Sequence, residues 1–402
     1  GALFWMVVAA FLGMATKYSE GLLAVKYRTV AEDGHSLGGP FYYIELGMGK
    51  NFKWLAKIFA FFGVCVGLFG IGTFSQVNGI SSAVHGFFDP NDAFTVKILP
   101  FLGEYSWSVV IASLILSFCV AAVLIGGVKR IASVSQIIVP FMAVIYFVFA
   151  VILICCNITK VPAAFATIVT AAFSPKAITG GAVGSMLIAM QKGVARGIFS
   201  NESGLGSAPI AAAAAQTKEP VRQGLVSMTG TFIDTIVICT MTGLSIVLTG
   251  AWQVEGLEGV QVTTYAFQHG LPFPAQFSSF ILMLCLVFFA FTTILGWDYY
   301  SERCLEYLSG GNMKHVKIFR WIYILAVFIG PYMTVSAVWT IADIFNGLMA
   351  IPNMIALFAL SGVIVKETRA FFQHAKEEAR AEHRSFEEVC EENLNEEEAP
   401  AN

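Results

Sequence analysis

Long apolar stretches alternate with short polar ones along most of this chain, a pattern typical of helices that cross a membrane. Apolar runs of about 18 residues or more are long enough to span a bilayer, and charged residues, Gly and Pro punctuate them here. The pattern predicts nine spans, at approximately 1–26, 54–86, 107–128, 132–157, 178–217, 223–250, 276–304, 316–337 and 340–365. We therefore expect an all-α polytopic membrane protein.

The predicted span 178–217 is too long to be one helix. Its roughly 40 residues would form about 60 Å of helix, about twice the hydrocarbon thickness. Residues 199–209, FSNESGLGSAP, place turn formers and glycines in its middle, so we expect a break there. Ser203 or Ser207 is expected to cap the second half, with Pro209 in its first turn.

A break at membrane depth is tolerated only where it is buried in protein or lines a cavity. Transporters use such discontinuous helices to bind substrates and coupling ions, and the N-terminus of the second half would favour a carboxylate. The alternative is a kink that binds no ligand.

Composition and charge agree with a membrane protein. Hydrophobic residues make up 56 % of the chain and charged residues 13 %, against about a quarter charged in soluble proteins. The net charge of −3 hides an acidic tail, because 11 Glu and 5 Lys or Arg follow from Lys366 onward, leaving about +3 for the rest. Nothing in this distribution suggests a nucleic-acid partner.

The tail differs from the rest of the chain. We expect a transmembrane domain over 1–366 and an acidic cytoplasmic tail over 367–402, read as a short surface helix fading into acidic disorder. A regulatory or partner-binding tail is the alternative.

Positive charge orients the predicted spans, because cytoplasmic loops carry an excess of Lys and Arg. One set of loops is basic, with Lys26, Arg28, Lys50, Lys53, Lys57, Lys129, Arg130, Lys218, Arg222, Lys314, Lys317, Arg320, Lys366 and Arg369. The alternate loops hold only Lys97, Lys160 and Lys176, beside several acidic residues. The basic loops are therefore expected to face the cytoplasm. Residue 1 then lies on the outer side of the cell membrane, and the C-terminus lies on the cytoplasmic side.

Ionisable residues inside spans are costly and are functional candidates by default. Those in the predicted spans are Lys17, Glu20, Lys192, Arg196, Glu202, Asp234, Asp298 and Asp343. Three of them flank the predicted break and are expected to neutralise one another: Lys192, Arg196 and Glu202.

Lys17 and Asp298 lie toward the cytoplasmic ends of their spans, where they are expected to reach water. Asp234 lies mid-span in TGTFIDTIVICTMTG. A structural salt bridge and a role in ion coupling are both open for it.

Two polar clusters are candidates to face the break. Gln76 and Asn78 lie in GIGTFSQVNG, and Thr292, Thr293 and Trp297 lie in FTTILGW. Hydroxyl oxygens suit a hard cation such as sodium, while Trp and Gln suit the wall of a site for a small zwitterion. The alternative is that each cluster joins helices, or that the threonines bond to the preceding turn.

Motifs of enzymes are missing from the sequence. It contains no GxSxG, HExxH or GxxxxGK[ST]. The cysteines in its apolar blocks are expected to be small buried hydrophobes rather than metal ligands: Cys65, Cys119, Cys155, Cys156, Cys239 and Cys285. We therefore expect no enzyme. An ion channel is the main alternative from another class, but no repeated filter-like loop or ring of charges appears.

Several long segments resemble one transporter family. They are GPFYYIELGMG, GVARGIFSNESGLGSAPIAAAAAQT, GLVSMTGTFIDTIVICTMTGL and GWDYYSERCLEYL. In this order they resemble the alanine or glycine:cation symporter family, and the resemblance runs from Gly1 to about Lys366. The acidic tail lies outside it.

The resemblance implies a leucine-transporter-like core of five-plus-five inverted repeats. It also implies symport of alanine or glycine with sodium into the cell by alternating access, with protons as a less usual driver and no cofactor besides the coupling ion. Substrate contacts carry over to Gln76, Phe199, Ser200, Asn201, Thr293 and Trp297. The sodium site carries over to Thr292 and Thr293.

The N-terminal end departs from the family pattern. GALFWMVVAAFLGMA begins inside an apolar run without a basic flank, so it does not resemble a signal peptide. The family's first core helix, a broken one with a TGN-type motif, is missing, and nine spans equal ten core helices less that one. We therefore expect an N-terminally truncated chain that does not transport by itself.

Overall fold

The computed structural model describes residues 1–31, 34–97, 104–173, 181–381 and 385–395. The α-helices there are α1 Ala2–Lys26, α2 Pro40–Tyr42, α3 Lys53–Phe69, α4 Phe74–Phe88, α5 Trp107–Leu124, α6 Gly127–Cys156, α7 Val161–Phe173, α8 Gly181–Asn201, α9 Ala208–Ala212, α10 Pro220–Thr231, α11 Thr240–Thr249, α12 Val260–Gly270, α13 Ala275–Leu308, α14 Met313–Ile329, α15 Val335–Ala359, α16 Ser361–Ala381 and α17 Phe386–Asn395.

Shorter elements join these helices. The π-helices are η1 Tyr43–Met48 and η4 Phe232–Cys239, and the 3₁₀ turns are η2 Lys50–Phe52, η3 Ile158–Lys160, η5 Ala251–Gln253 and η6 Gly330–Tyr332. Two small antiparallel pairs complete the described part: β1 Thr29–Val30 with β2 Ser36–Leu37, and β3 Thr95–Lys97 with β4 Glu104–Ser106.

The all-α polytopic class is confirmed. Seven helical segments of the described chain are long and apolar enough to cross a membrane: Ala2–Lys26, Lys50–Phe88, Trp107–Leu124, Lys129–Cys156, Pro220–Thr249, Ala275–Leu308 and Val335–Ala359. Each overlaps a predicted span. α14 falls on the predicted span 316–337 with 17 residues. The predicted span 178–217 begins at 178–180, outside the described residues. The inverted repeat stays a prediction.

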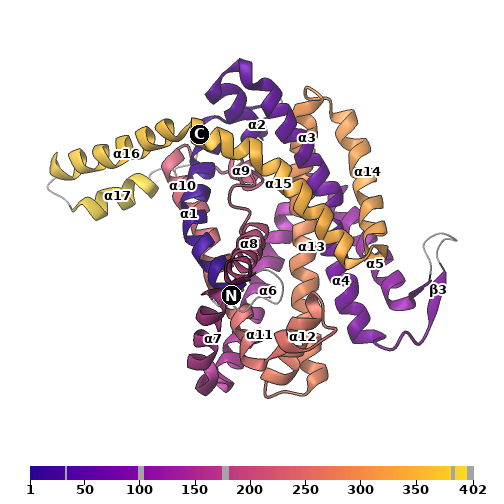
Figure 1. Cartoon of the computed structure of the whole chain (residues 1–402). Helices are drawn as coiled ribbons and strands as arrows, with labels where there is room; N and C mark the ends of the chain where they lie inside the picture. The colour runs from indigo at the N-terminus through magenta and orange to yellow at the C-terminus, as the bar shows by residue number, and fades with distance from the viewer. Residues whose placement is uncertain (32–33, 98–103, 174–180, 382–384, 396–402) are drawn as a thin grey trace.

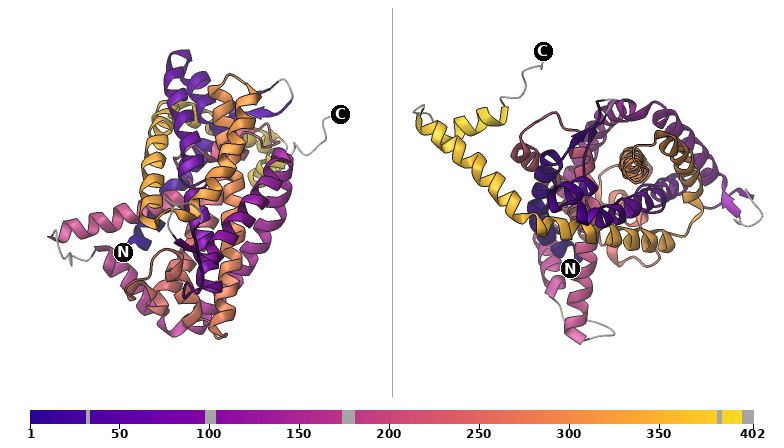
Figure 2. Two further views of the ribbon diagram at one scale, coloured as in Figure 1. Left: turned by 90° about the vertical axis from the view of Figure 1, so that its right-hand side faces the viewer. Right: turned by 90° about the horizontal axis from the view of Figure 1, so that it is seen from above.

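The long helix α13 lies in the middle of the bundle, enclosed by neighbours from both ends of the sequence (Figures 1 and 2). It packs against α3, α4, α6 and α14. Such a central helix is apolar on most faces, and the sequence FILMLCLVFFAF in its first half supplies that surface.

The second predicted span, 54–86, corresponds to one candidate membrane span, Lys50–Phe88, but its helix is interrupted. α3 ends at Phe69 and α4 begins at Phe74. The interruption lies against α13, where a Cβ added at Gly72 would meet the Cβ of Trp297 at 2.8 Å. The hydroxyl of Tyr323 donates to the carbonyl of Gly72 at 3.0 Å. Glycine is therefore required for the close approach of two helices here.

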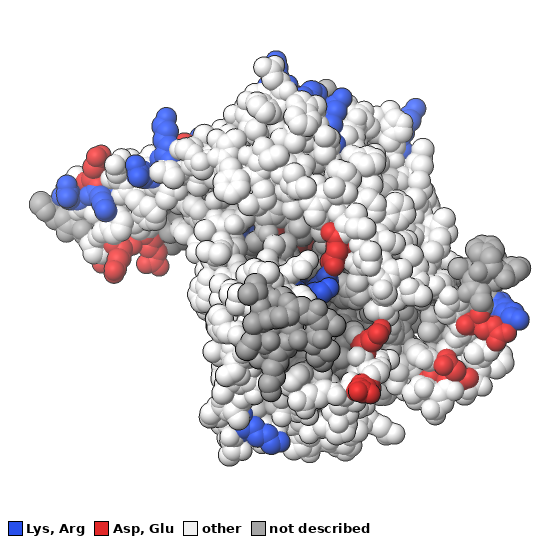
Figure 3. All heavy atoms as spheres, viewed as in Figure 1, with Lys and Arg blue, Asp and Glu red and all other residues white. Residues whose placement is uncertain are grey.

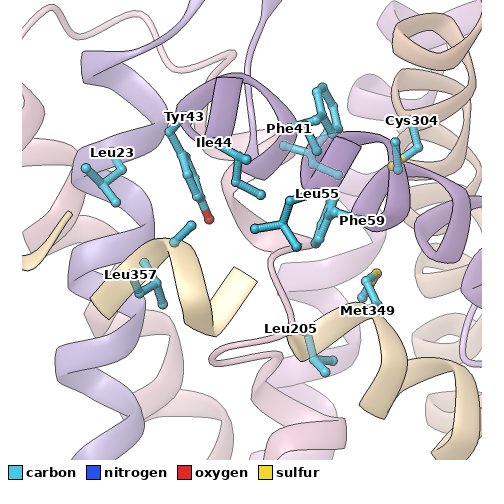
Figure 4. Close-up of a cluster of buried hydrophobic side chains, with 14 of the residues drawn as sticks. Leu23, Phe41, Tyr43, Ile44, Leu55, Phe59, Leu205, Cys304, Met349 and Leu357 are labelled. Carbon is cyan, nitrogen blue, oxygen red and sulfur yellow. The ribbon is translucent and has the colours of Figure 1, made fainter. Parts of the chain in front are cut away.

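A second packing feature joins the loop between α8 and α9 to the rest of the bundle. Leu205, in that loop, is 1 % exposed and belongs to a cluster of buried side chains that also contains Leu23, Tyr43, Phe59 and Met349 (Figure 4). These come from α1, η1, α3 and α15. One apolar side chain thus anchors the loop in the largest described part of the core.

Two helices and part of the tail were not expected. α7 and α12 fall in segments predicted as loops, because their 13 and 11 residues are too few for a span. In the tail, α16 is followed by α17, and Ala375, Ala379 and Val389 pack together between them. The expectation of a short helix fading into disorder is therefore wrong over Phe386–Asn395.

Charge is distributed unevenly over the surface. On the face drawn in Figure 3, most Lys and Arg side chains outside the tail gather at the upper end, where Figure 1 shows α2 and the start of α3. Acidic side chains lie lower on the same face. On this face, basic and acidic side chains therefore lie mostly toward different ends of the bundle.

Gly72→Ala tests the close approach of α3 and α13. The new Cβ would lie 2.4 Å from the carbonyl oxygen of Gly67 and 2.8 Å from the Cβ of Trp297, so we expect a loss of about 1–3 kcal/mol from overpacking. Thermal unfolding in detergent measures it. The matched control is Gly79→Ala on α4, where nothing lies within 4 Å of the added Cβ. Equal unfolding temperatures for the two variants would contradict the packing argument.

Candidate functional site

Residues 202–207 separate α8 from α9 and leave the helical conformation, in the stretch where the sequence predicts a break. Glu202, Gly204 and Gly206 have φ angles of 58°, 83° and 84°. Glycine adopts this left-handed region freely, whereas it is uncommon for other residues. The conformation of Glu202 therefore needs support from its surroundings.

That support comes from the side chain of Glu202 itself. The indole N–H of Trp297 donates to its Oε1 at 3.0 Å, and the hydroxyl of Ser207 donates to its Oε2 at 2.8 Å. Trp297 is 1 % exposed. A charge-assisted hydrogen bond to a buried donor is among the stronger ones, so α13 holds the start of the break.

The peptide groups of the break bond to side chains from α1 and α15. Gly206 N–H donates to Glu20 Oε1 at 3.1 Å. The carbonyl of Gly204 accepts from Asn353 Nδ2 at 2.9 Å. At the end of α8, the carbonyl of Asn201 accepts from Lys17 Nζ at 2.6 Å. Side chains therefore replace the bonds that a continuous helix would make.

Glu20 is the centre of this arrangement. It is 0 % exposed, and its Oε1 also accepts from Asn353 Nδ2 at 2.7 Å. The hydroxyl of Tyr43 in turn donates to Asn353 Oδ1. Glu20 Oε2 is buried and has no hydrogen-bond partner in the described part of the chain. The carboxylate keeps a free acceptor beside the break.

The last residues of α8 bond to the π-helix η4. Ser200 Oγ and Thr235 Oγ1 both donate to Asp234 Oδ2 at 2.7 Å, and Asn201 Nδ2 donates to Thr235 Oγ1 at 2.9 Å. Within the residues that the structure describes, Asp234 forms no salt bridge. Since π-helical turns are frequent at functional sites, the hydroxyl-bound Asp234 favours a role beyond structural charge pairing.

Phe199 lies beside an ion pair between α8 and α15. Its ring centroid is 4.8 Å from that of Trp339, and the Arg196 guanidinium lies 4.5 Å from the Trp339 ring and 5.5 Å from the Phe199 ring. Arg196 also donates to Asp343 Oδ1 at 2.6 Å. The ion pair is partly exposed, so Phe199 lies at the edge of the bundle's interior.

The remaining predicted contacts are not hydrogen-bonded to the break. Gln76 is half-buried, one turn beyond Gly72. Thr292 and Thr293 donate to the carbonyl of Phe289 at 2.9 and 3.0 Å. Their hydroxyl protons bond to the preceding turn, as in the alternative from the sequence, and their oxygens keep lone pairs for a cation.

Three expectations about polar side chains are wrong. Ser207 occupies the N-cap position of α9, but neither serine side chain caps the helix, because the Ser207 hydroxyl bonds to Glu202 and the Ser203 hydroxyl donates to the carbonyl of Gly13. Pro209 does lie in the first turn, but α9 has only five residues. No extended second half exists for a carboxylate to face.

The expected charge neutralisation is the second error. Arg196 pairs with Asp343 rather than with Glu202, whose oxygens accept from Trp297 and Ser207. The third error concerns Lys17 and Asp298, which were expected to reach water. Lys17 is 9 % exposed and bonds to the break, and Asp298 is 0 % exposed, because neighbouring helices cover both.

One described cluster with metal-ligand geometry lies at the C-terminal end of α4. His85, Asp89 and Asp92 place their ligand atoms within 4.8 Å of one another. However, Asp89 already accepts from Ser106 Oγ at 2.6 Å and from Ala93 N–H at 2.8 Å. These bonds hold the pKa of Asp89 below its ordinary value. The geometry fits a capped hairpin without any metal.

Sequence reasoning missed the residues that hold the break. Glu20 was noticeable as a carboxylate inside a span, but its partners were not, because Asn353 is 333 positions away. Tyr43 and Asn353 carry no motif that marks them as partners of Glu20.

Comparison with known proteins gives a consistent picture. The model of the sodium:alanine symporter family matches residues 1–385. An uncharacterized transporter of Haemophilus influenzae is 54 % identical over 377 residues, 94 % of this chain and 78 % of the relative. The sodium/alanine symporter AgcS of Methanococcus maripaludis is 45 % identical over 385 residues, 94 % and 79 %. A probable sodium/glutamine symporter, GlnT of Bacillus subtilis, is 36 % identical over 378 residues, 94 % and 73 %.

Glu20→Leu tests whether this carboxylate holds the break. The substitution removes the acceptor of Gly206 N–H and of Asn353, and we expect a loss of about 1–3 kcal/mol for each donor left unsatisfied. Thermal unfolding in detergent is the measurement. Glu20→Gln keeps an acceptor of the same shape and should unfold near the parent. If Gln and Leu destabilise equally, the negative charge rather than the hydrogen bonds holds the break.

Proposed function

This chain belongs to the sodium:alanine symporter family, and we propose that it moves alanine or glycine together with sodium into the cell by alternating access. The protein is a multi-pass membrane transporter and not an enzyme. The observation that carries the proposal is the break between α8 and α9. Its non-helical backbone lies inside a helical bundle, the arrangement by which transporters bind substrate and ion.

The amino acid is proposed to bind on the α8 side of the break. Ser200 and Asn201 end α8, Trp297 reaches the break from α13, and Phe199 closes one edge beside Trp339. Gln76 and Thr293 complete the proposed set. These side chains combine aromatic walls with a few polar groups, as small-molecule sites do.

Sodium is proposed to bind the free oxygen lone pairs of Thr292 and Thr293. Hydroxyl oxygens are hard ligands, and adjacent helical residues point about 100° apart, so one threonine could serve the ion while the other faces substrate. Asp234 is a proposed coupling residue, because its carboxylate bonds to Ser200 at the substrate side.

Coupling then follows from linkage. A sodium ion that favours the state that binds amino acid raises the affinity for that amino acid, and the amino acid raises the affinity for sodium by the same factor. Uptake of labelled alanine with and without a sodium gradient, by the chain extended with the N-terminal helix that the family resemblance predicts to be missing, tests this proposal. Excess glycine measures whether both substrates share the site.

The orientation is also proposed. The basic loops lie on the cytoplasmic side of the cell membrane, so the tail after Lys366 is cytoplasmic and the hairpin of β3 and β4 faces outward. Lipid surrounds the exposed apolar side chains of the spans, for example Phe118 and Phe358, 74 % and 73 % exposed.

Trp297→Phe tests the substrate site while keeping an aromatic ring in the core. It removes the indole donor to Glu202, leaving a buried acceptor without its partner at about 1–3 kcal/mol. We expect the alanine concentration for half-maximal uptake to rise by roughly tenfold. Trp321→Phe is the matched control, since Trp321 is 64 % exposed. Parental uptake in both variants would assign Trp297 to packing only.

Thr292→Val and Thr293→Val test the sodium site. Valine nearly keeps the shape of threonine but lacks the oxygen, so we expect a higher sodium concentration for half-maximal uptake with little change at saturation. Sodium titrations of alanine uptake measure it. Thr340→Val is the control, because that hydroxyl also bonds to its preceding turn, through Ser336. If all three curves overlay the parent's, sodium binds elsewhere.

A further inference from the structure

The second half of α13 carries three buried carboxyl groups. Asp298, Glu302 and Glu306 are 0 %, 2 % and 5 % exposed and follow one another at intervals of four residues. Residues four apart lie on one face of a helix. This acidic stripe begins directly after Trp297 and takes no part in the proposed substrate site.

Two arginines neutralise two of these carboxylates. Arg320, on α14, donates from Nε to Glu302 Oε1 at 2.7 Å and from a terminal nitrogen to Glu302 Oε2 at 2.9 Å. Arg303 forms an ion pair with Glu306 at 2.7 Å. Arg303 and Arg320 are thus paired with Glu306 and Glu302, and among the described residues no cation forms an ion pair with Asp298.

Hydrogen bonds from the described residues do not compensate the carboxyl group of Asp298 either. Both of its carboxyl oxygens are buried without a hydrogen-bond donor in the described part of the chain. An ionised carboxylate in that position would lose its hydration and gain no hydrogen bond in return, which is expensive. A single proton removes the charge and also supplies a donor.

The acceptor for that proton is one turn away. The carboxyl groups of Asp298 and Glu302 lie one turn apart on the same face of α13. We propose that the two share one proton, so that Asp298 is a neutral acid that donates to the carboxylate of Glu302, itself fixed by Arg320. Asp298 and Glu302, with Arg320, thus form a proton-binding site between α13 and α14.

The other groups that face Asp298 leave this pairing intact. From α14, Tyr323 is 0 % exposed and already donates to the carbonyls of Gly72 and Ile294. On α13, Arg303 pairs with Glu306, whose other oxygen lies 3.2 Å from His35 Nε2. α3 contacts this part of α13 through glycines, which carry no ionisable group: Gly63 lies against Cys304 and Gly67 against Ser301.

The proton site has a consequence for transport. This consequence rests on the proposed function, but the existence of the site does not. The proton enters from water and returns to it only when α13 and α14 separate enough to admit water. A conformational change that opens this contact would release the proton, and closing would require its uptake. Alkaline conditions would then disfavour the closed contact.

Infrared spectroscopy of the purified protein, labelled with [4-¹³C]aspartate, tests the site directly. The sequence contains only six aspartates, and the label separates them from Glu20 and Glu202. We expect an aspartic-acid C=O band at neutral pH that is lost in Asp298→Asn. Asp92→Asn is the spectroscopic control, because that side chain is 60 % exposed, and it should keep the band.

Each outcome decides the proposal. Absence of the band from the parent protein overturns it without any variant, as does its persistence in Asp298→Asn. If Asp298→Asn does not fold, Glu302→Gln replaces it and must shift the band, since the acceptor changes. An unshifted band overturns the proposal.

Measurements of alanine uptake distinguish a failure of the proton site from a failure of the proposed function. Alanine uptake by the parent should fall from mildly acidic to mildly alkaline pH, and the fall should be absent in Asp298→Asn. If no alanine uptake occurs at all, the proposed function fails while the infrared result still decides the proton site.

Discussion

A peptide group in the interior of a membrane protein has no water to bond with, and each one left unpaired is costly. Residues 202–207 place several such groups inside the bundle. Glu20 and Asn353 supply partners for them, Lys17 bonds to the carbonyl of Asn201 just before them, and Leu205 adds an apolar anchor. The break exists because two other helices carry these side chains to the right depth.

This requirement makes the break part of a unit with α1 and α15. Glu20 and Asn353 bond to each other as well as to the break, so neither helix can move away without leaving buried donors unpaired. The contact with α13 is of a different kind, because it depends on one indole N–H and one carboxylate. A change of conformation would therefore cost less at Trp297 than at Glu20.

The sequence was sufficient for what depends on local composition. Apolar length predicts the spans, and the glycines and serines of 199–209 predict where α8 ends. It was insufficient where distant residues decide. Nothing local shows that Arg196 meets Asp343, that Gly72 meets Trp297, or that neighbouring helices cover Asp298. Thr292 and Thr293 lie between these cases, since their helix was predictable, whereas the sequence left open whether their hydroxyls bind a cation or the preceding turn.

Trp297 and Asp298 are neighbours on α13, so their side chains point about 100° apart. Trp297 bonds to the break, while Asp298 lies on the stripe of Glu302, which Arg320 ties to α14. A helix is stiff over this distance, and α13 is uninterrupted through both residues. A rotation or shift of α13 that changes one contact therefore changes the other. Substrate binding at the break and proton binding in the stripe would bias the same movement, without any longer chain of contacts between them.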